Sequence, residues 1–142
     1  EEKLEAYKNI TTCLNNEQLT ELASDWANRY GLIPEPVESL IQIMRLKLLA
    51  KKCGFISIKI RKPNIILNTT MKINAFKHLK EELPTNIQNK FIFQSEHDSE
   101  MSRVIIRGLG VLDTQMQIEN LINWFSTMSI SVEKLLTQEI KI

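Results

Sequence analysis

Apolar residues in the first third of the chain recur at the spacing of one helix face. Leu4, Tyr7, Ile10 and Leu14 fall on one side of a helix predicted over residues 2–14. Asn15 and Asn16 can cap the helix that follows, because their side chains can accept from its first free N–H groups. That second helix is predicted to end before Gly31, and its apolar stripe consists of Leu19, Leu22, Ala23, Trp26 and Tyr30.

A third helix is predicted between a pair of prolines and a glycine. Pro34 and Pro36 bracket its start, where a proline loses no hydrogen bond. It is predicted to end at about Cys53, before Gly54.

After Gly54 the apolar period changes from 3.6 to 2. Ile56, Ile58 and Ile60 alternate with polar residues, which predicts a half-buried strand with the isoleucines inward. Further strands are predicted at 65–70, 91–93 and 104–106. Helices are predicted at 74–83, with Phe76, Leu79 and Leu83 inward, and from Asp113 or Thr114 onward, with Met116, Ile118, Leu121, Ile122 and Phe125 as its apolar positions.

This order predicts an α+β fold, in which three N-terminal helices precede a ββαββα part with a mainly antiparallel four-stranded sheet. We expect one domain over residues 1–128, with a helical part at 1–53 and a sheet-containing part at 54–128. Residues 129–142 are expected to form a C-terminal tail, with one more helix as a possibility.

Charge is segregated along the chain, although the formal net charge is only +1. Residues 1–44 carry three basic and eight acidic side chains, residues 45–80 carry ten basic and none acidic, and residues 81–142 carry five basic and nine acidic. Such blocks favour a polarised surface and a charged partner; the alternative is that they interleave in space and cancel. The two cysteines, Cys13 and Cys53, fit reduced thiols of a cytosolic protein, with a disulfide or a reactive thiol as the alternative.

The sequence offers no constellation for catalysis. It lacks a phosphate-binding loop, and Gly108-Leu109-Gly110 fits a structural turn better than a dinucleotide site because Asp113 stands where the third glycine should be. His78 and His97 have no cysteines nearby to complete a zinc site. We therefore expect no enzyme activity, cofactor or metal in this chain.

One segment of the chain reads Asn28-Arg29-Tyr30-Gly31-Leu32-Ile33-Pro34-Glu35-Pro36-Val37 and is followed by Leu40, Ile43, Leu46-Lys47, Ala50 and Cys53-Gly54. This segment resembles a pattern of the C-terminal domain of bacterial transcription-repair coupling factors. Lys3-Leu4-Glu5-Ala6-Tyr7-Lys8 and Arg107-Gly108-Leu109-Gly110-Val111 are similar to further parts of that domain, in a cyanobacterial-type version. The resemblance extends over nearly the whole chain. It implies that the chain is a piece of a longer, cytoplasmic bacterial protein.

The resemblance also implies a function. The parent would be an ATP- and magnesium-dependent double-stranded DNA translocase that displaces stalled RNA polymerase and recruits nucleotide-excision repair. Its C-terminal domain would act as an autoinhibitory brake, docking on a UvrB-like N-terminal module and masking the surface that binds UvrA.

Glu17, Glu21 and Asp25 recur every fourth residue opposite the apolar stripe of their helix, so we expect them to form a docking surface with Asn28 and Arg29. Asn28 departs from the family pattern, which has an acid there. An ordinary solvated helix face is the alternative.

A second hypothesis, from another class, is a nucleic-acid-binding module. Its basic surface would consist of Arg45, Lys51, Lys52, Lys59, Arg61 and Lys62, with Lys47 in the same run and the hairpin as a β-ribbon. One observation counts against it, because no aromatic residues interleave with these cations.

Overall fold

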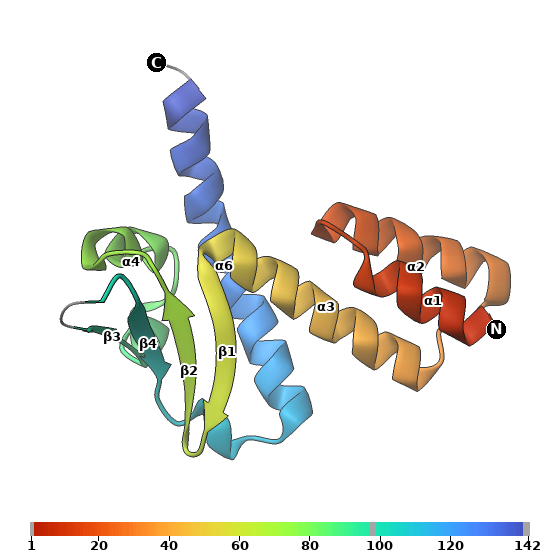
Figure 1. Cartoon of the computed structure of the whole chain (residues 1–142), viewed down its shortest axis with the longest axis horizontal. Coiled ribbons are helices and arrows are strands. Elements are labelled where there is room, and N and C mark those ends of the chain that lie inside the picture. The colour runs from red at the N-terminus through yellow and green to blue at the C-terminus, as the bar shows by residue number, and fades with distance from the viewer. Residues whose placement is uncertain (1, 97–98, 141–142) are drawn as a thin grey trace. The chain divides into compact units, whose positions relative to one another are not determined.

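The computed structural model of the chain describes residues 2–96 and 99–140, and the side chains of residues 4–96 and 99–135. The described residues have the predicted α+β architecture (Figure 1). In chain order the elements are α1 (Glu2–Thr11), α2 (Asn16–Tyr30), α3 (Glu35–Cys53), β1 (Phe55–Arg61), β2 (Asn64–Thr69), α4 (Ile73–Leu79), α5 (Thr85–Gln88), β3 (Phe91–Ser95), β4 (Ser102–Ile106), the 3-10 turn η1 (Leu109–Val111) and α6 (Thr114–Ile140). The chain forms two compact units, Glu1–Leu49 and Ala50–Ile142.

The first unit is built around α1, α2 and most of α3. Its core consists of the buried residues Ile10, Leu19, Val37 and Ile41. The predicted cap of α2 is confirmed, because Asn15 Oδ1 accepts from Gln18 N at 2.8 Å, and Gln18 Oε1 accepts in return from Leu14 N at 2.8 Å. Gly31 ends this helix with a φ of +81°, a left-handed conformation that favours glycine.

The second unit holds a four-stranded antiparallel sheet with the strand order β1-β2-β4-β3. Its inner face packs against α6 and α4 through aromatic pairs. Phe55 contacts Phe125 at 5.3 Å between ring centroids, Phe91 contacts Trp124 at 5.8 Å, and Phe93 contacts Phe76 at 5.6 Å. Phe76, Leu79 and Leu83 are buried, as the sequence predicts.

Several predicted boundaries and faces were wrong. Strand β1 has an irregular register between Phe55 and Ser57, so Phe55 is buried and Ile56 is 62% exposed, against the expected alternation. The first helix ends at Thr11 instead of residue 14. The helix predicted at 74–83 ends at Leu79 and is followed by the short α5. Of the apolar positions named for the last helix, Leu121 and Phe125 are buried, whereas Met116, in the first turn of α6, is 46% exposed.

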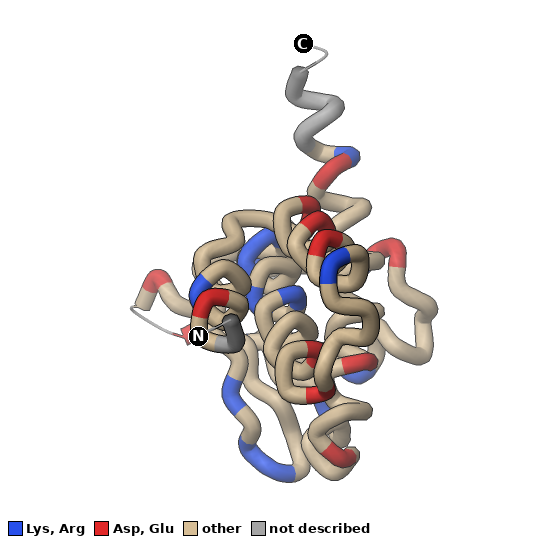
Figure 2. The backbone as a smooth tube through the Cα atoms, turned by 90° about the vertical axis from the view of Figure 1, so that its right-hand side faces the viewer, with Lys and Arg blue, Asp and Glu red and all other residues tan. Residues whose placement is uncertain are grey.

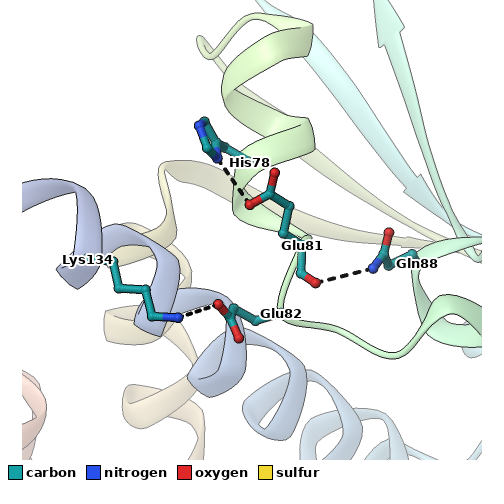
Figure 3. Close-up of polar contacts among 5 residues, drawn as sticks. All are labelled: His78, Glu81, Glu82, Gln88 and Lys134. Carbon is teal, nitrogen blue, oxygen red and sulfur yellow. Dashed lines mark hydrogen bonds and ion pairs between the residues drawn. The ribbon is translucent and has the colours of Figure 1, made fainter.

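The last helix runs unbroken from Thr114 to Ile140, so it includes most of the residues expected as a separate tail; residues 141–142 lie outside the described part. Two ion pairs tie its later turns to the rest of the unit. Lys134 Nζ lies 2.6 Å from Glu82 Oε1 (Figure 3), and Glu133 Oε1 lies 2.5 Å from Lys52 Nζ. The loop between α4 and α5, which carries Glu82, is held by Gln88 Nε2, which donates to Leu83 O at 2.7 Å.

No helix among the described residues is both long enough and apolar enough to cross a membrane.

Candidate functional site

The exposed face of α2 carries an acidic ribbon, which we define as Glu17, Glu21 and Asp25. The helical spacing places these carboxylates opposite Leu19, which is fully buried in the core of the first unit. All three are exposed, and none forms an ion pair within the described part of the chain. Like charges one turn apart repel each other by about 0.2–0.5 kcal/mol per pair. The ribbon therefore presents negative charge that no cation of the described residues neutralises.

Asn28 and Arg29, the other two residues predicted for this surface, are exposed on the last turns of the same helix. Arg29 lies one turn after Asp25 and forms no ion pair with it in the described structure. The structure thus places all five predicted residues on one helix; their role in docking stays a prediction.

A hollow of about 170 Å³ opens beside the ribbon, and all three helices of the first unit contribute to its lining. Its charged residues are Glu5, Asp25 and Arg29. Its other lining residues are Ala6, Asn9, Ile10, Leu22, Trp26, Tyr30, Val37 and Ile41.

Trp26 and Tyr30 give this hollow an aromatic surface that the sequence analysis did not predict. Their spacing predicts a place in the core stripe for both, but Trp26 is half-buried and Tyr30 is 53% exposed. Their rings pack against each other with centroids 5.0 Å apart. The Nε1 atom of Trp26 is buried and has no hydrogen-bond acceptor in the structure. Such an unmet donor costs about 1–3 kcal/mol, which an acceptor from a binding partner could recover.

One feature of the sequence could have indicated that these aromatic residues lie at the surface. Asp25 and Arg29 each precede one of the two aromatic residues, so the end of the helix mixes charge with aromatic surface. Aromatic residues with a polar tip are common at interfaces, where one end of the ring system is apolar and the other is wet.

The residues of the predicted basic surface belong to both compact units, and their role as one surface stays a prediction. Arg45 belongs to the first unit, where its Nη1 donates to Thr20 Oγ1 at 3.3 Å. Lys51 and Lys52 end α3, and Lys52 is paired with Glu133. Lys59, Arg61 and Lys62 lie on the β1–β2 hairpin of the second unit, where basic residues are blue in Figure 2. Arg61 pairs with Asn64 across the hairpin, and at the same end of the sheet lie Arg107, just after β4, and Lys90, just before β3, two cations that the sequence pattern did not single out.

Gly108-Leu109-Gly110 forms a tight structural turn against this hairpin. Gly110 N donates to Pro63 O at 3.0 Å, and Gly108 N donates to Asn64 Oδ1 at 3.2 Å. A side chain at Gly110 would meet Asn64 O at 2.9 Å, so the turn requires glycine there for close backbone approach.

Both cysteines are free thiols. Burial raises the pKa of the Cys53 thiol to about 12, although nearby Lys52 partly opposes this. Burial also raises the pKa of the half-buried Cys13 thiol. Raised pKa values keep both thiols protonated and weakly nucleophilic near neutral pH. Within the described residues no group of three or more His, Cys, Asp or Glu side chains is arranged to hold a metal ion.

Comparisons with known proteins bear on the first half of the chain most directly. The family described as the TRCF domain matches residues 1–81, which include the acidic ribbon and the hollow beside it. A search of the curated proteins found no match. Among solved structures, the chain is similar to the crystal structure of the C-terminal domain of a transcription-repair coupling factor. The TM-score is 0.69 and the identity 17%, over 94% of this chain and 82% of that one, a likeness that shows the fold alone.

Proposed function

Because the chain belongs to the TRCF domain family, we propose that it is the regulatory, non-catalytic C-terminal domain of a transcription-repair coupling factor. In the full-length protein it docks on the UvrB-like N-terminal module and masks the surface that binds UvrA. ATP and magnesium act in the motor of that protein, which contacts DNA and displaces RNA polymerase in the cytoplasm.

The observation that carries this proposal is the acidic ribbon, which lies inside the matched residues and has no counter-charge in the described structure. Three carboxylates at successive turns of one helix suit a partner that presents arginines, because charge-assisted hydrogen bonds are about twice as strong as neutral ones. The adjoining hollow adds aromatic surface and the unmet Trp26 N–H. Together they offer a docking surface with a charged rim and an aromatic centre.

A brake of this kind needs only a small energy difference. A closed state that is favoured by about 2.7 kcal/mol keeps the open state near one per cent. Two or three charge-assisted contacts supply energy of that order. Losing them would release the UvrA-binding surface without unfolding the domain.

The test is charge reversal of Glu21→Lys and Asp25→Lys together in the full-length protein, followed by measurement of UvrA binding. Both residues are exposed, so the domain should stay folded. The expected result is UvrA affinity raised about tenfold or more. The control is Glu100→Lys with Glu119→Lys, which makes the same change of net charge at exposed positions of the second unit. Equal UvrA binding by the ribbon variant and the control would refute docking through this helix.

A further inference from the structure

The outer face of the sheet, opposite α4 and α6, is organised into three rows that run across the strands. Strand register defines two rows completely and the Arg61–Asn64 pair of the remaining one, because paired residues on neighbouring strands point to the same face. The basic row contains Arg61 and Asn64, followed by Arg107 and Lys90, which lie just after β4 and just before β3 and are joined by a hydrogen bond from Arg107 N to Lys90 O. The isoleucine row contains Lys59, Ile66, Ile105 and Ile92. The third row contains Ser57, Asn68, Arg103 and Gln94.

The basic row carries positive charge that the described residues leave unpaired. Arg61, Lys90 and Arg107 are exposed, as are Lys59 and Lys62 beside them, and none of the five forms an ion pair with a described carboxylate. Arg107 is held in place, because its Nη2 donates to Asn89 O at 3.0 Å and its N–H donates to Lys90 O at 2.9 Å. No position of the three rows is acidic, and Glu96, directly after β3, forms an ion pair with Arg103 of the third row at 3.2 Å. The unpaired positive charge of this face is therefore that of the basic row and its neighbours, which attracts an anionic partner.

The isoleucine row gives the same face an apolar strip. Ile92 is 37% exposed, and Ile66 and Ile105 are half-buried by their neighbours in the sheet. The aromatic side chains of these strands, Phe55, Phe91 and Phe93, instead contact the helices on the inner face. Single-stranded nucleic acid binds by stacking its bases on exposed aromatic rings, which the outer face does not offer. Phosphate backbone would also leave the isoleucines without an apolar partner.

We propose that the outer face is a docking site for an acidic amphipathic helix of another protein. This surface is distinct from the acidic ribbon, and the proposal goes beyond the brake described above. The apolar stripe of the bound helix covers the isoleucine row, and its acidic flank faces Arg61, Arg107 and Lys90.

The dimensions of the rows fit such a helix. Adjacent strands lie about 4.8 Å apart, so Ile66 and Ile92, two strands apart, are separated by roughly 10 Å. A helix advances about 10.5 Å from position i to i+7, which aligns residues i, i+4 and i+7 with the three isoleucines. The basic row lies two residues along the strands, about 6.7 Å away, within reach of a flanking position on a helix about 10 Å wide.

The test uses fluorescence anisotropy with two probes and the 142-residue chain. The first probe is a labelled synthetic helix with leucine and alanine at i, i+4 and i+7 and glutamate on the flanking positions; the second replaces those glutamates with glutamine. The acidic helix should bind, and the glutamine version should bind about tenfold more weakly.

Two variants separate the basic and apolar contributions. Arg61→Glu with Lys90→Glu should weaken binding of the acidic helix about tenfold or more. The control, Lys72→Glu with Lys77→Glu, makes the same charge change at exposed positions at the start of and within α4, and its affinity should stay within about twofold of the parent's. Ile92→Thr should weaken binding about threefold or more, against no change for Ile73→Thr, an exposed isoleucine on α4. Thermal melting confirms that each variant is folded.

The proposal is overturned if the acidic helix does not bind, or if row and control variants lose binding equally. A labelled DNA duplex of about 20 base pairs is the remaining probe. Duplex binding that falls with Arg61→Glu and Lys90→Glu but ignores Ile92→Thr would identify a nucleic-acid site instead, and would also overturn it.

Discussion

The backbone N–H of Gly110 donates to the carbonyl oxygen of Pro63 across 3.0 Å, which joins the turn before α6 to the tip of the β1–β2 hairpin. The contact is so close that a Cβ atom at Gly110 would lie 2.9 Å from Asn64 O and 3.0 Å from Pro63 O. Both neighbours are backbone atoms, which cannot move aside as a flexible side chain could. The hairpin that carries Arg61 and Lys62 is therefore fixed in place by this glycine.

Gly110→Ala should lower the free energy of unfolding by about 1–3 kcal/mol, because the added methyl group overpacks the contact with the hairpin. Gly108→Ala is the matched control. Gly108 has a φ of +77°, but a Cβ atom added there would meet no atom within 4 Å, so its substitution costs only backbone strain of about 1 kcal/mol. Denaturant unfolding measures both. A smaller loss for Gly110→Ala than for Gly108→Ala would contradict the packing argument.

Local signals predicted much of the fold. Asn15 and Gly31 delimit α2 because a cap and a left-handed residue act through their immediate neighbours. Asp113 likewise starts α6, with its Oδ1 accepting from Met116 N at 2.9 Å. The alternation of apolar residues identified strands β1 and β2.

The remaining features depend on contacts between distant segments. The irregularity at Ile56 reverses its expected face, and no residue near it in the sequence indicates that. Trp26 fits a core stripe by spacing alone, but its burial depends on how far α1 and α3 cover the end of α2. Lys90 and Arg107 lie at the same end of the sheet as Arg61 because of the strand order β1-β2-β4-β3, which alternation does not specify. The residues of the predicted basic surface are divided between the two compact units, so its role stays a prediction.

The stability of the second unit should fall between pH about 9 and about 12 because of Cys53. Burial raises the pKa of this thiol from its ordinary value of 9.0 to about 12. In that window the unfolded chain releases a proton that the folded chain retains, so the free energy of unfolding decreases as pH rises, by up to about 1.4 kcal/mol per pH unit. Below pH about 9 the thiol is protonated in both states and contributes no pH dependence.

Unfolding curves for the parent, Cys53→Ala and Cys13→Ala across this window isolate the effect. Cys53→Ala should flatten the pH dependence relative to the parent, apart from a constant loss of packing. Cys13→Ala should change the slope less, because Cys13 is only half-buried. Parallel curves for the parent and Cys53→Ala would show that this thiol does not set the slope.

The ion pair between Glu82 and Lys134 should contribute little to stability despite its separation of 2.6 Å. The two side chains are 36% and 61% exposed, so water screens their attraction. A double-mutant cycle with Glu82→Ala and Lys134→Ala should give a coupling energy of about 0.2–1 kcal/mol that decreases with added salt. A coupling energy that salt leaves unchanged would contradict an exposed pair.

Trp26 and Trp124 are the two tryptophans of the chain, and each reports on a different compact unit. Trp124 is 7% exposed and packs edge-on against Phe91, so Trp124→Ala should cost about 3–5 kcal/mol. Trp26 is half-buried, so Trp26→Ala should cost less, about 1–3 kcal/mol. Unfolding followed by circular dichroism measures each loss, and the fluorescence of the remaining tryptophan shows that the other unit is unchanged.

Trp26→Phe tests the unmet hydrogen-bond donor itself. Phenylalanine keeps most of the ring surface against Tyr30 but removes the buried N–H, which has no acceptor among the described residues. The lost surface and the relieved donor offset each other, so the free energy of unfolding should change by less than about 1 kcal/mol. In the full-length protein the same variant should raise UvrA affinity, because a docked module can no longer accept from this N–H. A loss of stability as large as that of Trp26→Ala would mean that the indole N–H is already satisfied within the domain, which would remove it from the proposed docking surface.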